Sequence, residues 1–289
     1  MTAKSPKNRT KTRHYKRRKQ ISKKHYAKRI FIGIFCLIIL IIGWHLYQKA
    51  RFYYAMYFKS STSYNLSNTK YEEERIAKIV TEYQDKTFGI DISHYQRKQD
   101  IAWDSLAIAN GSIPISFIVL RATMGKKSKD QHFEEFWQNS KKHNLIRGAY
   151  HFYRPDEDPV QQANNFLDQV KLESGDLPPV LDIEKLPHRI SKEQLIENLK
   201  IWCKIVEQAY GAKPIIYSYY FYHRDVLKNH FEDYPLWLAN YNDVLQPSEG
   251  KEWDFWQFSE KGIVQGIRTK VDVNIYNGGL WALKSLTID

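Results

Sequence analysis

From Thr87 to the C-terminus, short apolar runs rich in β-branched residues alternate with longer amphipathic stretches. This alternation predicts parallel βαβ units. The predicted strands are Phe88–Ile92, Phe117–Ala122, Gly148–Phe152, Val180–Ile183, Pro214–Ser218, Leu236–Ala239, Phe255–Phe258 and Val271–Ile275. Helical patterns lie between the first five, near Trp103–Asn110, Phe133–His143, Val160–Leu172 and Ser191–Tyr210, the last with Ser191 as N-cap and Gln194 at the capping-box position. Eight strands in about 200 residues favour a closed α/β barrel, and the short, polar connections between the last three predict an irregular final part.

Most of the predicted strands end in polar or aromatic residues. In a parallel barrel the C-terminal strand ends converge on one mouth, where active sites are built. Acids and rings would therefore meet there, which favours a carbohydrate site; the chain has no Gly-rich phosphate loop. The residues concerned are Asp91 and Ser93, Tyr150 to Phe152, Asp182 and Glu184, Tyr217 and Ser218, Asn240 and Tyr241, Gln257, and Asp272 with Asn274.

The segment Pro178–Glu184 is an apolar run that ends in two carboxylates one residue apart. On a strand, Asp182 and Glu184 would point to the same face, with Cα atoms roughly 6.5–7 Å apart. If one acid is desolvated beside the charge of the other, its pKa rises and it can donate a proton near neutral pH, which is the chemistry of a glycosidase. From this segment alone, acids that cap a helix or face water remain the alternative.

The net charge of +12 is concentrated at the N-terminus. Of the 44 Lys and Arg residues, 13 lie in residues 1–29, which contain no Asp or Glu; this leaves 31 against 32 acidic residues in the rest of the chain. Polybasic arms can bind nucleic acid, but an apolar run follows directly. We therefore interpret residues 1–29 as a cytoplasmic topology signal that contacts anionic lipid, and expect no nucleic-acid partner.

Residues Ile30–Trp44 carry no charged side chain, and Trp44 and Tyr47 suit a membrane interface. We predict a transmembrane signal anchor over residues 30–47, a stalk over 48–86 and a catalytic domain over 87–289. The charged stretch Tyr71–Tyr83 within the stalk has a helical pattern. A cleaved signal peptide is the competing interpretation, but no clear small-x-small site follows the apolar run. The positive-inside rule places the body of the protein outside the cytoplasm. Cys36 then lies in the predicted membrane span and Cys203 in the predicted catalytic domain, so the two cannot form an intradomain disulfide.

Several blocks together resemble the glycoside hydrolase family 25 lysozymes, in order from about Phe88 to Gly278. They are Gly89-Ile90-Asp91-Ile92-Ser93 with Gln96, Arg147 to Phe152, Pro179 to Glu184, Trp237-Leu238-Ala239-Asn240-Tyr241, Trp256-Gln257-Phe258-Ser259, Gly262, Val264, Gly266-Ile267 and Val271-Asp272-Val273-Asn274.

This resemblance implies an irregular, TIM-like (β/α)5(β)3 barrel that cleaves the β-1,4 bond between N-acetylmuramic acid and N-acetylglucosamine in peptidoglycan. By the same resemblance, Glu184 is the general acid, and Asp182 is the ionised partner that stabilises the oxocarbenium-like centre or orients the substrate N-acetyl group. Asp91 and Asp272 complete an acidic floor, and five residues line the cleft: Tyr150, Tyr217, Trp237, Tyr241 and Gln257. No cofactor, metal or obligate protein partner is expected. The expected location is the bacterial cytoplasmic membrane, with the barrel periplasmic or extracellular.

The chain also departs from the family pattern. The second strand reads Arg121-Ala122-Thr123-Met124-Gly125 where the family usually has Lys and a Thr-Glu-Gly turn, and Arg97 replaces a common Gly. These changes bear on subsite preference. The retaining, inverting and substrate-assisted routes stay open. So do two other functions, a non-catalytic peptidoglycan-binding scaffold and a glycosidase acting on another N-acetylhexosamine polymer.

Overall fold

The computed structural model describes residues 10–54, 69–250 and 252–289. It divides into two compact units, residues 1–54 and 55–289. The start of the predicted basic tail (residues 1–9) and part of the predicted stalk (55–68) lie outside the described residues.

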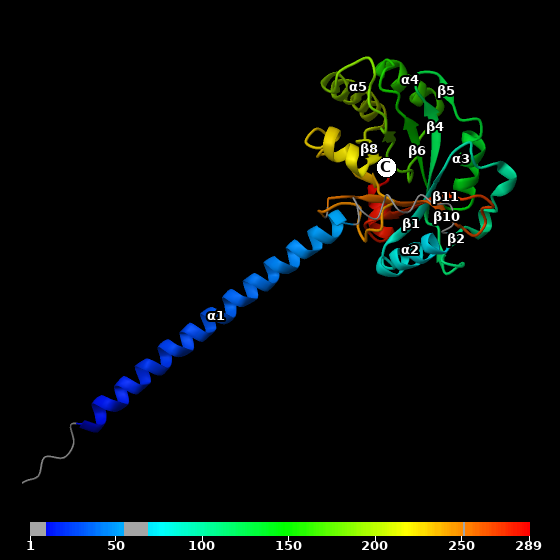
Figure 1. Cartoon of the computed structure of the whole chain (residues 1–289). Coiled ribbons are helices and arrows are strands. Elements are labelled where there is room, and N and C mark those ends of the chain that lie inside the picture. Colours follow the sequence, from blue (N-terminus) through cyan, green and yellow to red (C-terminus); the bar gives the residue numbers. More distant parts are fainter. Residues whose placement is uncertain (1–9, 55–68, 251) are drawn as a thin grey trace, which may run out of the picture. The chain divides into compact units, whose positions relative to one another are not determined.

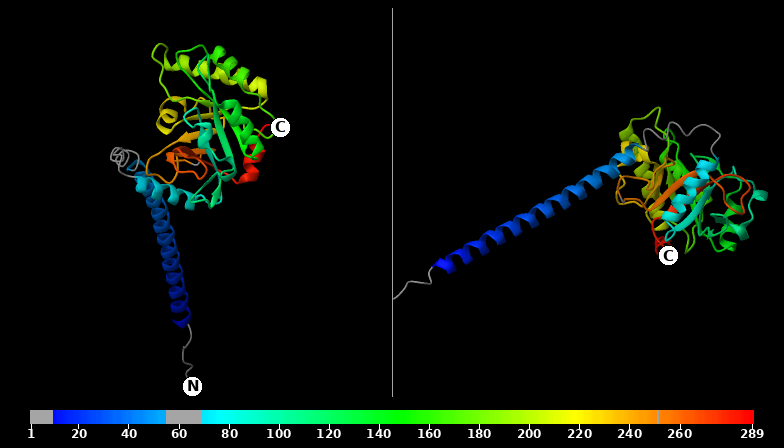
Figure 2. Two further views of the ribbon diagram at one scale, coloured as in Figure 1. Left: turned by 90° about the vertical axis from the view of Figure 1, so that its right-hand side faces the viewer. Right: turned by 60° about the horizontal axis from the view of Figure 1, so that its bottom comes forward.

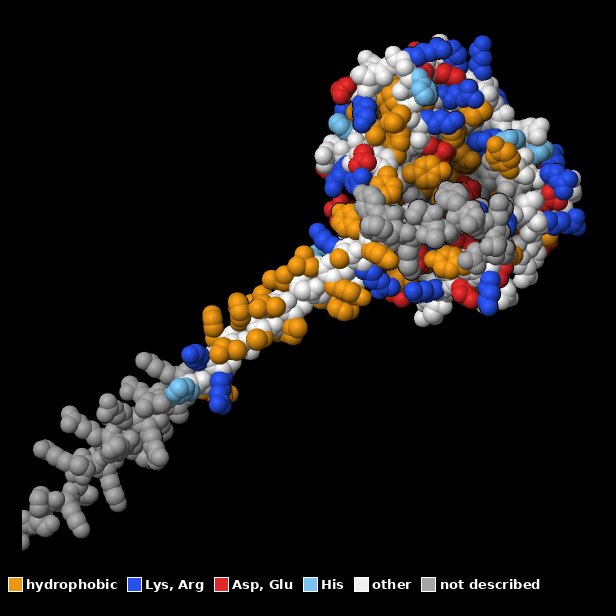
Figure 3. Space-filling model, viewed as in Figure 1, with side chains coloured by type: hydrophobic (Ala, Val, Ile, Leu, Met, Phe, Trp, Pro, Cys, Tyr) orange, Lys and Arg blue, Asp and Glu red, His pale blue; other side chains and the backbone are white. Residues whose placement is uncertain are grey.

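The first unit is the helix α1 (Thr10–Tyr54). Within it, the stretch His25–Arg51 is long and apolar enough to cross a membrane, and its apolar part is not buried in the structure. Its apolar side chains from Ile30 to Tyr47 are exposed, and on the face seen in Figure 3 they cover this stretch, with Lys and Arg side chains at its N-terminal end. A helix that is apolar on all sides is a buried core helix or a membrane span.

Eight strands of the second unit form a closed barrel (Figure 1). All eight predicted strands are present. Their bounds are β1 (Thr87–Ile92), β4 (Phe117–Met124), β6 (Ile146–Phe152), β7 (Val180–Asp182), β8 (Ile215–Tyr219), β9 (Leu236–Ala239), β10 (Phe255–Gly262) and β11 (Val271–Tyr276). In this order, each strand from β1 to β10 pairs in parallel with the next, whereas β11 pairs antiparallel with both β10 and β1 and closes the barrel.

Three predicted crossover helices are confirmed as α3 (Phe133–Lys142), α4 (Pro159–Gln169) and α5 (Lys192–Tyr210). Ser191 caps α5, since its Oγ accepts a hydrogen bond from the Gln194 backbone N–H at 3.2 Å. The Gln194 side chain donates to Asn198 instead of closing a capping box. The short helix α6 (Tyr220–Tyr222) and the π-helical turn η5 (His223–Leu227) connect β8 to β9.

The helix predicted near Trp103–Asn110 is wrong. Residues 98–114 instead form the 3₁₀ turns η3 (Lys98–Asp100) and η4 (Trp103–Ser105), then a hairpin of β2 (Ala107–Ile108) and β3 (Ile113–Pro114). The reason lies in the turn, where Ala109, Asn110 and Gly111 all have positive φ (52°, 55° and 87°). A right-handed helix cannot continue through left-handed residues.

The interior of the barrel is filled by large side chains, among them Phe117, Trp237 and Phe255. Gly89 allows Phe117 to pack here, because a Cβ at Gly89 would lie 2.4 Å from that ring. His151 is buried against α4, where its ring nitrogens contact Thr123 Oγ1 (2.7 Å) and Gln162 Oε1 (3.1 Å). Burial lowers its pKa to about 4, which makes it a neutral core histidine.

Two helices and one short strand complete the second unit. The strand β5 (Ser128–Lys129) pairs with the end of β4, and α7 (Leu280–Leu286) lies near the C-terminus. The helix α2 (Thr69–Glu82) corresponds to the predicted helical pattern at Tyr71–Tyr83 and packs against β10 (Figure 2). The predicted stalk of residues 48–86 therefore includes a helix that rests on the barrel.

Candidate active site

A cleft of about 330 Å³ lies at the mouth of the barrel, where the parallel strands end. It brings together all nine residues predicted from the sequence: Asp91, Tyr150, Asp182, Glu184, Tyr217, Trp237, Tyr241, Gln257 and Asp272. One expectation about their placement is wrong. Asp272 does not follow a C-terminal strand end, because β11 runs antiparallel; it lies near the start of β11, directly opposite Asp91 in the β1–β11 register.

The backbone that carries the paired acids is held on both sides. The Tyr153 N–H donates to the Asp182 carbonyl (2.8 Å), and the Ile183 N–H donates to the Tyr217 carbonyl (3.0 Å). Ser218 Oγ then donates to the Ile183 carbonyl (2.7 Å). Glu184, one residue after this pinned peptide, is therefore presented from a fixed backbone although it lies beyond the end of β7.

Asp182 is buried and incompletely hydrogen-bonded. Its side chain lines the cleft, and Oδ1 is a buried oxygen with no hydrogen-bond partner in the structure. Burial, and then the negative charges of Glu184 and Asp91, hold the pKa of Asp182 well above its usual range. A buried acceptor without a donor is costly, so Oδ1 is an atom to which a ligand N–H or O–H can bind.

Glu184 is less enclosed and has donors nearby. Burial and the charge of Asp91 raise its pKa, whereas the nearby hydroxyls of Tyr217 and Tyr219 and the charge of Lys185 act in the opposite direction. The two acids are therefore unlike: Asp182, the more deeply buried, holds a proton more strongly, and Glu184 is the one that lies beside tyrosine hydroxyls. Two carboxyls this close do not both ionise freely near neutral pH.

Asp91 and Asp272 form a second acid pair. Burial raises the pKa of Asp91 to about 6, against the lowering effect of hydrogen bonds from Asn274, Gln257 and Asp272. Burial and the charge of Asp91 raise the pKa of Asp272 to about 9. At neutral pH Asp272 is therefore the protonated member of the pair, and its O–H donates a hydrogen bond to the ionised Asp91.

Neutral amides determine which member of this pair is charged. Asp91 Oδ2 accepts from Gln257 Nε2 (2.7 Å) and from Asn274 Nδ2 (2.8 Å). Gln257 Oε1 in turn accepts from the hydroxyls of Tyr217 (2.8 Å) and Tyr241, so the orientation of its amide is fixed. A chain of donors thus leads from the aromatic wall of the cleft to the Asp91 carboxylate.

Trp237 and Tyr217 lie on the floor of the cleft rather than on its rim, and both are buried. Their rings meet edge to face, with centroids 5.0 Å apart. The Trp237 indole N–H donates to Asn274 Oδ1 (3.1 Å), which leaves the Asn274 amide nitrogen to face Asp91. Trp237 therefore orients a partner of Asp91.

The cleft also contains residues that were not predicted from the sequence, among them Tyr95, Lys185 and Glu260. Lys185 directly follows Glu184, and Tyr95 lies two residues after Ser93, so strand-end motifs extended by two residues would have included both. Glu260 was missed because the seventh strand was expected to end at Phe258, whereas β10 continues to Gly262.

Arg121 lies at one end of the cleft and is held in place by neighbours. It bonds Asp130 (Nη2 to Oδ2, 3.1 Å) and contacts His94, and its guanidinium lies 5.9 Å from the Tyr95 ring centroid. A Lys at this position would lack the planar guanidinium that makes these contacts. The cleft therefore has a fixed cation at one end and an acid, Glu260, on the β10 wall.

Acids of unequal proton affinity in an aromatic-lined cleft at a barrel mouth define a glycoside hydrolase site, in which one acid protonates the leaving oxygen while another charge stabilises the sugar cation. Among residues 25–54, 69–250 and 252–289, no three His, Cys, Asp or Glu side chains are grouped to hold a metal ion.

Comparison with known proteins agrees with this class. Residues 90–267 match the model of the Glycosyl hydrolases family 25, and the chain belongs to this family. It is 37% identical to YegX of Escherichia coli (strain K12) over 68% of this chain and 72% of that protein, and 32% identical to Lysozyme M1 of Streptomyces globisporus over 68% and 70%. Its structure is similar to a bacterial lysozyme from Streptomyces coelicolor (TM-score 0.60, 29% identity, 70% and 97% covered) and to a family 25 glycosyl hydrolase from Bacillus anthracis (TM-score 0.63, 25%, 71% and 95%).

Proposed function

We propose that this protein is a membrane-anchored muramidase that cleaves the β-1,4 bond between N-acetylmuramic acid and N-acetylglucosamine in peptidoglycan. Glu184 is the general acid and Asp182 its ionised partner. The relatives named lysozyme support the substrate class. The observation that carries the proposal is the buried, unpartnered Oδ1 of Asp182 in the same cleft as Glu184.

Substrate binding assigns the two roles. Burial by itself favours the proton on Asp182 more than on Glu184. An N-acetyl sugar carries an amide N–H, which can donate to Asp182 Oδ1. Donation to a carboxylate stabilises its charged form and lowers its pKa. Asp182 then ionises, and its negative charge favours the proton on Glu184, beside the glycosidic oxygen.

The same contact favours a substrate-assisted route. An amide held through its N–H has its carbonyl oxygen free to approach the anomeric carbon as the glycosidic bond breaks, with Glu184 donating the proton to the leaving oxygen. The ionised Asp182 stabilises the positive charge that develops on the amide and the sugar ring. Asp91 and Asp272 form the acidic floor and hydrogen-bond the sugar.

Residues 30–47 anchor the barrel to the bacterial cytoplasmic membrane, with residues 1–29 on the cytoplasmic side. The apolar stretch His25–Arg51 supports this assignment, since at about 1.5 Å per residue it is long enough to cross a bilayer core of about 30 Å. The exposed apolar side chains of this stretch contact lipid, and the 13 basic residues before residue 30 favour this orientation. The barrel then acts on glycan strands outside the cytoplasm.

The test of the activity is Glu184→Gln in the full-length protein, purified in detergent and given isolated peptidoglycan. Turnover, measured as released reducing ends, should fall by about 10²- to 10⁴-fold, since a general acid contributes about that much. Asp168→Asn, an exposed acid on α4, is the matched control and should retain parental activity. Mass spectrometry should identify N-acetylmuramic acid at the new reducing ends. Equal activity of Glu184→Gln and parent overturns the assignment, and peptidoglycan binding by the parent without bond cleavage indicates a scaffold instead.

A further inference from the structure

The helix α2 precedes the residues that match the family model and carries a buried cation, Arg75, which is only 5% exposed. A guanidinium is costly to bury unless its donors are satisfied. Arg75 is also placed on the face of α2 that meets the barrel, next to the apolar contacts of Ile79 and Val80. Its partners therefore indicate why the helix carries an arginine at this position.

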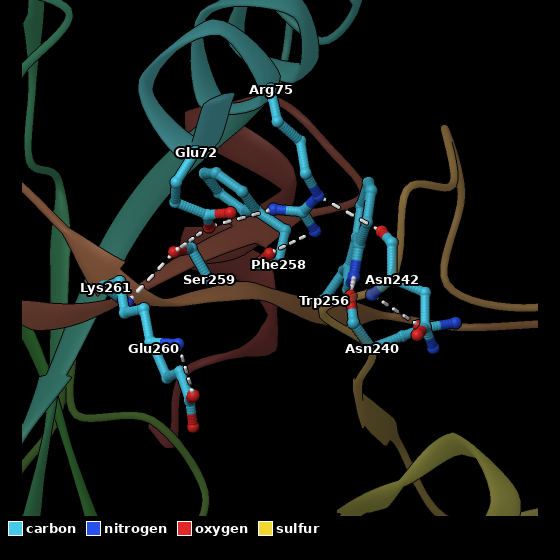
Figure 4. A network of polar contacts seen from close by, with 9 residues as sticks. All are labelled: Glu72, Arg75, Asn240, Asn242, Trp256, Phe258, Ser259, Glu260 and Lys261. Carbon is cyan, nitrogen blue, oxygen red and sulfur yellow. Dashed lines mark hydrogen bonds and ion pairs between the residues drawn. The ribbon is translucent and has the colours of Figure 1, made fainter. Parts of the chain in front are cut away.

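Arg75 donates to two backbone carbonyls of the barrel (Figure 4). Nε donates to the Asn242 carbonyl at 3.1 Å, and Nη2 donates to the Phe258 carbonyl at 2.5 Å. Nη1 donates to Glu72 Oε1 at 3.2 Å, one turn earlier on α2. Glu72 also accepts from Ser259 Oγ at 2.6 Å, so the ion pair itself is tied to β10.

The Phe258 carbonyl is available because β10 is bulged at this point. In the β10–β11 register, Gln257 faces Asn274 and Ser259 faces Val273, so Phe258 is skipped. A bulge disrupts the ladder locally and re-aims side chains. Figure 4 shows Ser259 turned toward α2 and Glu260 turned away from it. Arg75 thus satisfies a carbonyl that the bulge removes from regular pairing.

Both carbonyls adjoin residues of the cleft. Asn242 directly follows Tyr241, and Phe258 directly follows Gln257. Tyr241 and Gln257 bond each other, and Gln257 bonds Asp91. One side chain on α2 therefore holds two backbone segments whose neighbouring side chains orient an active-site acid.

A second contact ties α2 to the same loop. The Tyr83 hydroxyl, just beyond the end of α2, donates to the Leu245 carbonyl at 2.7 Å. Its ring also packs edge-on against Trp256, at 5.8 Å between centroids. Trp256 Nε1 in turn donates to the Asn240 carbonyl at 3.0 Å. The loop after β9 is thus held from α2 on both sides of Tyr241.

We propose that α2 contributes to catalysis and that Arg75 is a positioning residue. Arg75 holds Tyr241 and Gln257, which form one wall of the cleft, in the geometry needed for turnover. This inference rests on the proposed muramidase function for its kinetic consequence. It makes α2, which precedes the residues that match the family model, a determinant of cleft geometry.

The test compares four full-length variants in detergent. Arg75→Met removes the donors while keeping an apolar stem, and Arg75→Lys restores the charge with a single donor group. Lys78→Met alters an exposed cation on the same helix, and Ile79→Ala weakens the α2 contact without touching either carbonyl. Turnover on soluble glycan strands, thermal unfolding and amide hydrogen exchange are measured for each.

Arg75→Met should lower kcat by at least about 10-fold with a smaller change in KM, because misplaced groups slow the chemical step. Arg75→Lys should recover part of this loss, whereas Lys78→Met and Ile79→Ala should stay within about 2-fold of the parent, although Ile79→Ala unfolds at a lower temperature. Amides of residues 240–247 should exchange at least about 10-fold faster in Arg75→Met than in Ile79→Ala.

Unchanged exchange in residues 240–247 overturns the inference, and so does faster exchange with an unchanged kcat. A kcat loss in Arg75→Met no larger than that in Ile79→Ala also overturns it, because the arginine would then only help to stabilise the fold. If the parent releases no reducing ends, the muramidase proposal fails by itself, and the exchange comparison still decides whether Arg75 holds this wall.

Discussion

Replacing Asp272 by Asn should stabilise the folded protein. Burial and the charge of Asp91 raise the pKa of Asp272 to about 9, from an ordinary value of 3.8. An acid whose pKa is raised on folding must take up a proton to fold at neutral pH, so it opposes folding. Asn is neutral at every pH, and its amide can donate to Asp91 as the protonated carboxyl does.

The size of the effect follows from linkage. At pH 7 the cost is about 1.36 kcal/mol for each of the roughly three pH units between the unfolded pKa and neutrality, or about 4 kcal/mol as an upper bound. Asp272 is partly exposed, which reduces this, so we expect about 2–4 kcal/mol. At about 2–4 °C per kcal/mol for a domain of this size, Tm should rise by roughly 4–16 °C.

The direction of the Asp272 pKa shift also determines how the stability of the protein changes with pH. The contribution of Asp272 to stability is fully present below its unfolded pKa of 3.8 and is lost as the pH rises toward about 9. The Tm advantage of Asp272→Asn should therefore be small near pH 4 and grow with pH up to about 9.

The assay is thermal unfolding of parent and variant in one detergent across this pH range. The control is Asp168→Asn, which removes an exposed charge and should change stability by no more than about 0.5 kcal/mol. A Tm for Asp272→Asn that equals or falls below the parental Tm at pH 7, or an advantage that does not change with pH, refutes the electrostatic account of this pair.

Two further predictions concern single contacts. Asp182→Asn should lower turnover by about 10²- to 10³-fold while peptidoglycan binding persists, since it removes a charge needed mainly in the transition state; co-sedimentation with peptidoglycan and a reducing-end assay measure the two separately. Arg147→Met should lower the free energy of unfolding by about 3–5 kcal/mol, because it leaves Asp176, bonded to Arg147 at 2.6 and 3.1 Å, as an unpaired buried charge. Urea unfolding measures this loss, and the double variant with Asp176→Leu should recover most of it.

The strands were predictable because each is a short apolar run bounded by polar residues, and all eight were placed within a few positions. The first crossover was not. Trp103–Asn110 has spacing compatible with a helix, but the left-handed backbone from Ala109 to Gly111 imposes a hairpin turn. The extension of β10 past Phe258 was missed for a similar reason, since a bulge interrupts the alternation that marks a strand.

The composition of the cleft was predictable from strand ends, but its proton distribution was not. Sequence spacing places Asp182 and Glu184 together without showing that Asp182 Oδ1 lacks a partner or that Tyr217 and Tyr219 reach Glu184. The role of Arg75 was likewise hidden. In the sequence it is one cation in a charged stretch, and only the fold places it against two carbonyls distant in the chain.

The two acid pairs are linked by the charge of Asp91. The amides of Gln257 and Asn274 stabilise that charge, and it is a cause of the raised pKa of both Asp182 and Glu184. A negative Asp91 makes it harder for the pair of Asp182 and Glu184 to lose its last proton, so in the proposed mechanism Glu184 keeps a proton when the substrate amide ionises Asp182. Gln257 and Asn274 are neutral at every accessible pH, yet they help to keep Glu184, the proposed general acid, protonated. This is also why a helix outside the barrel can matter for turnover: by holding the backbone beside Gln257, α2 acts on the donor that keeps Asp91 charged.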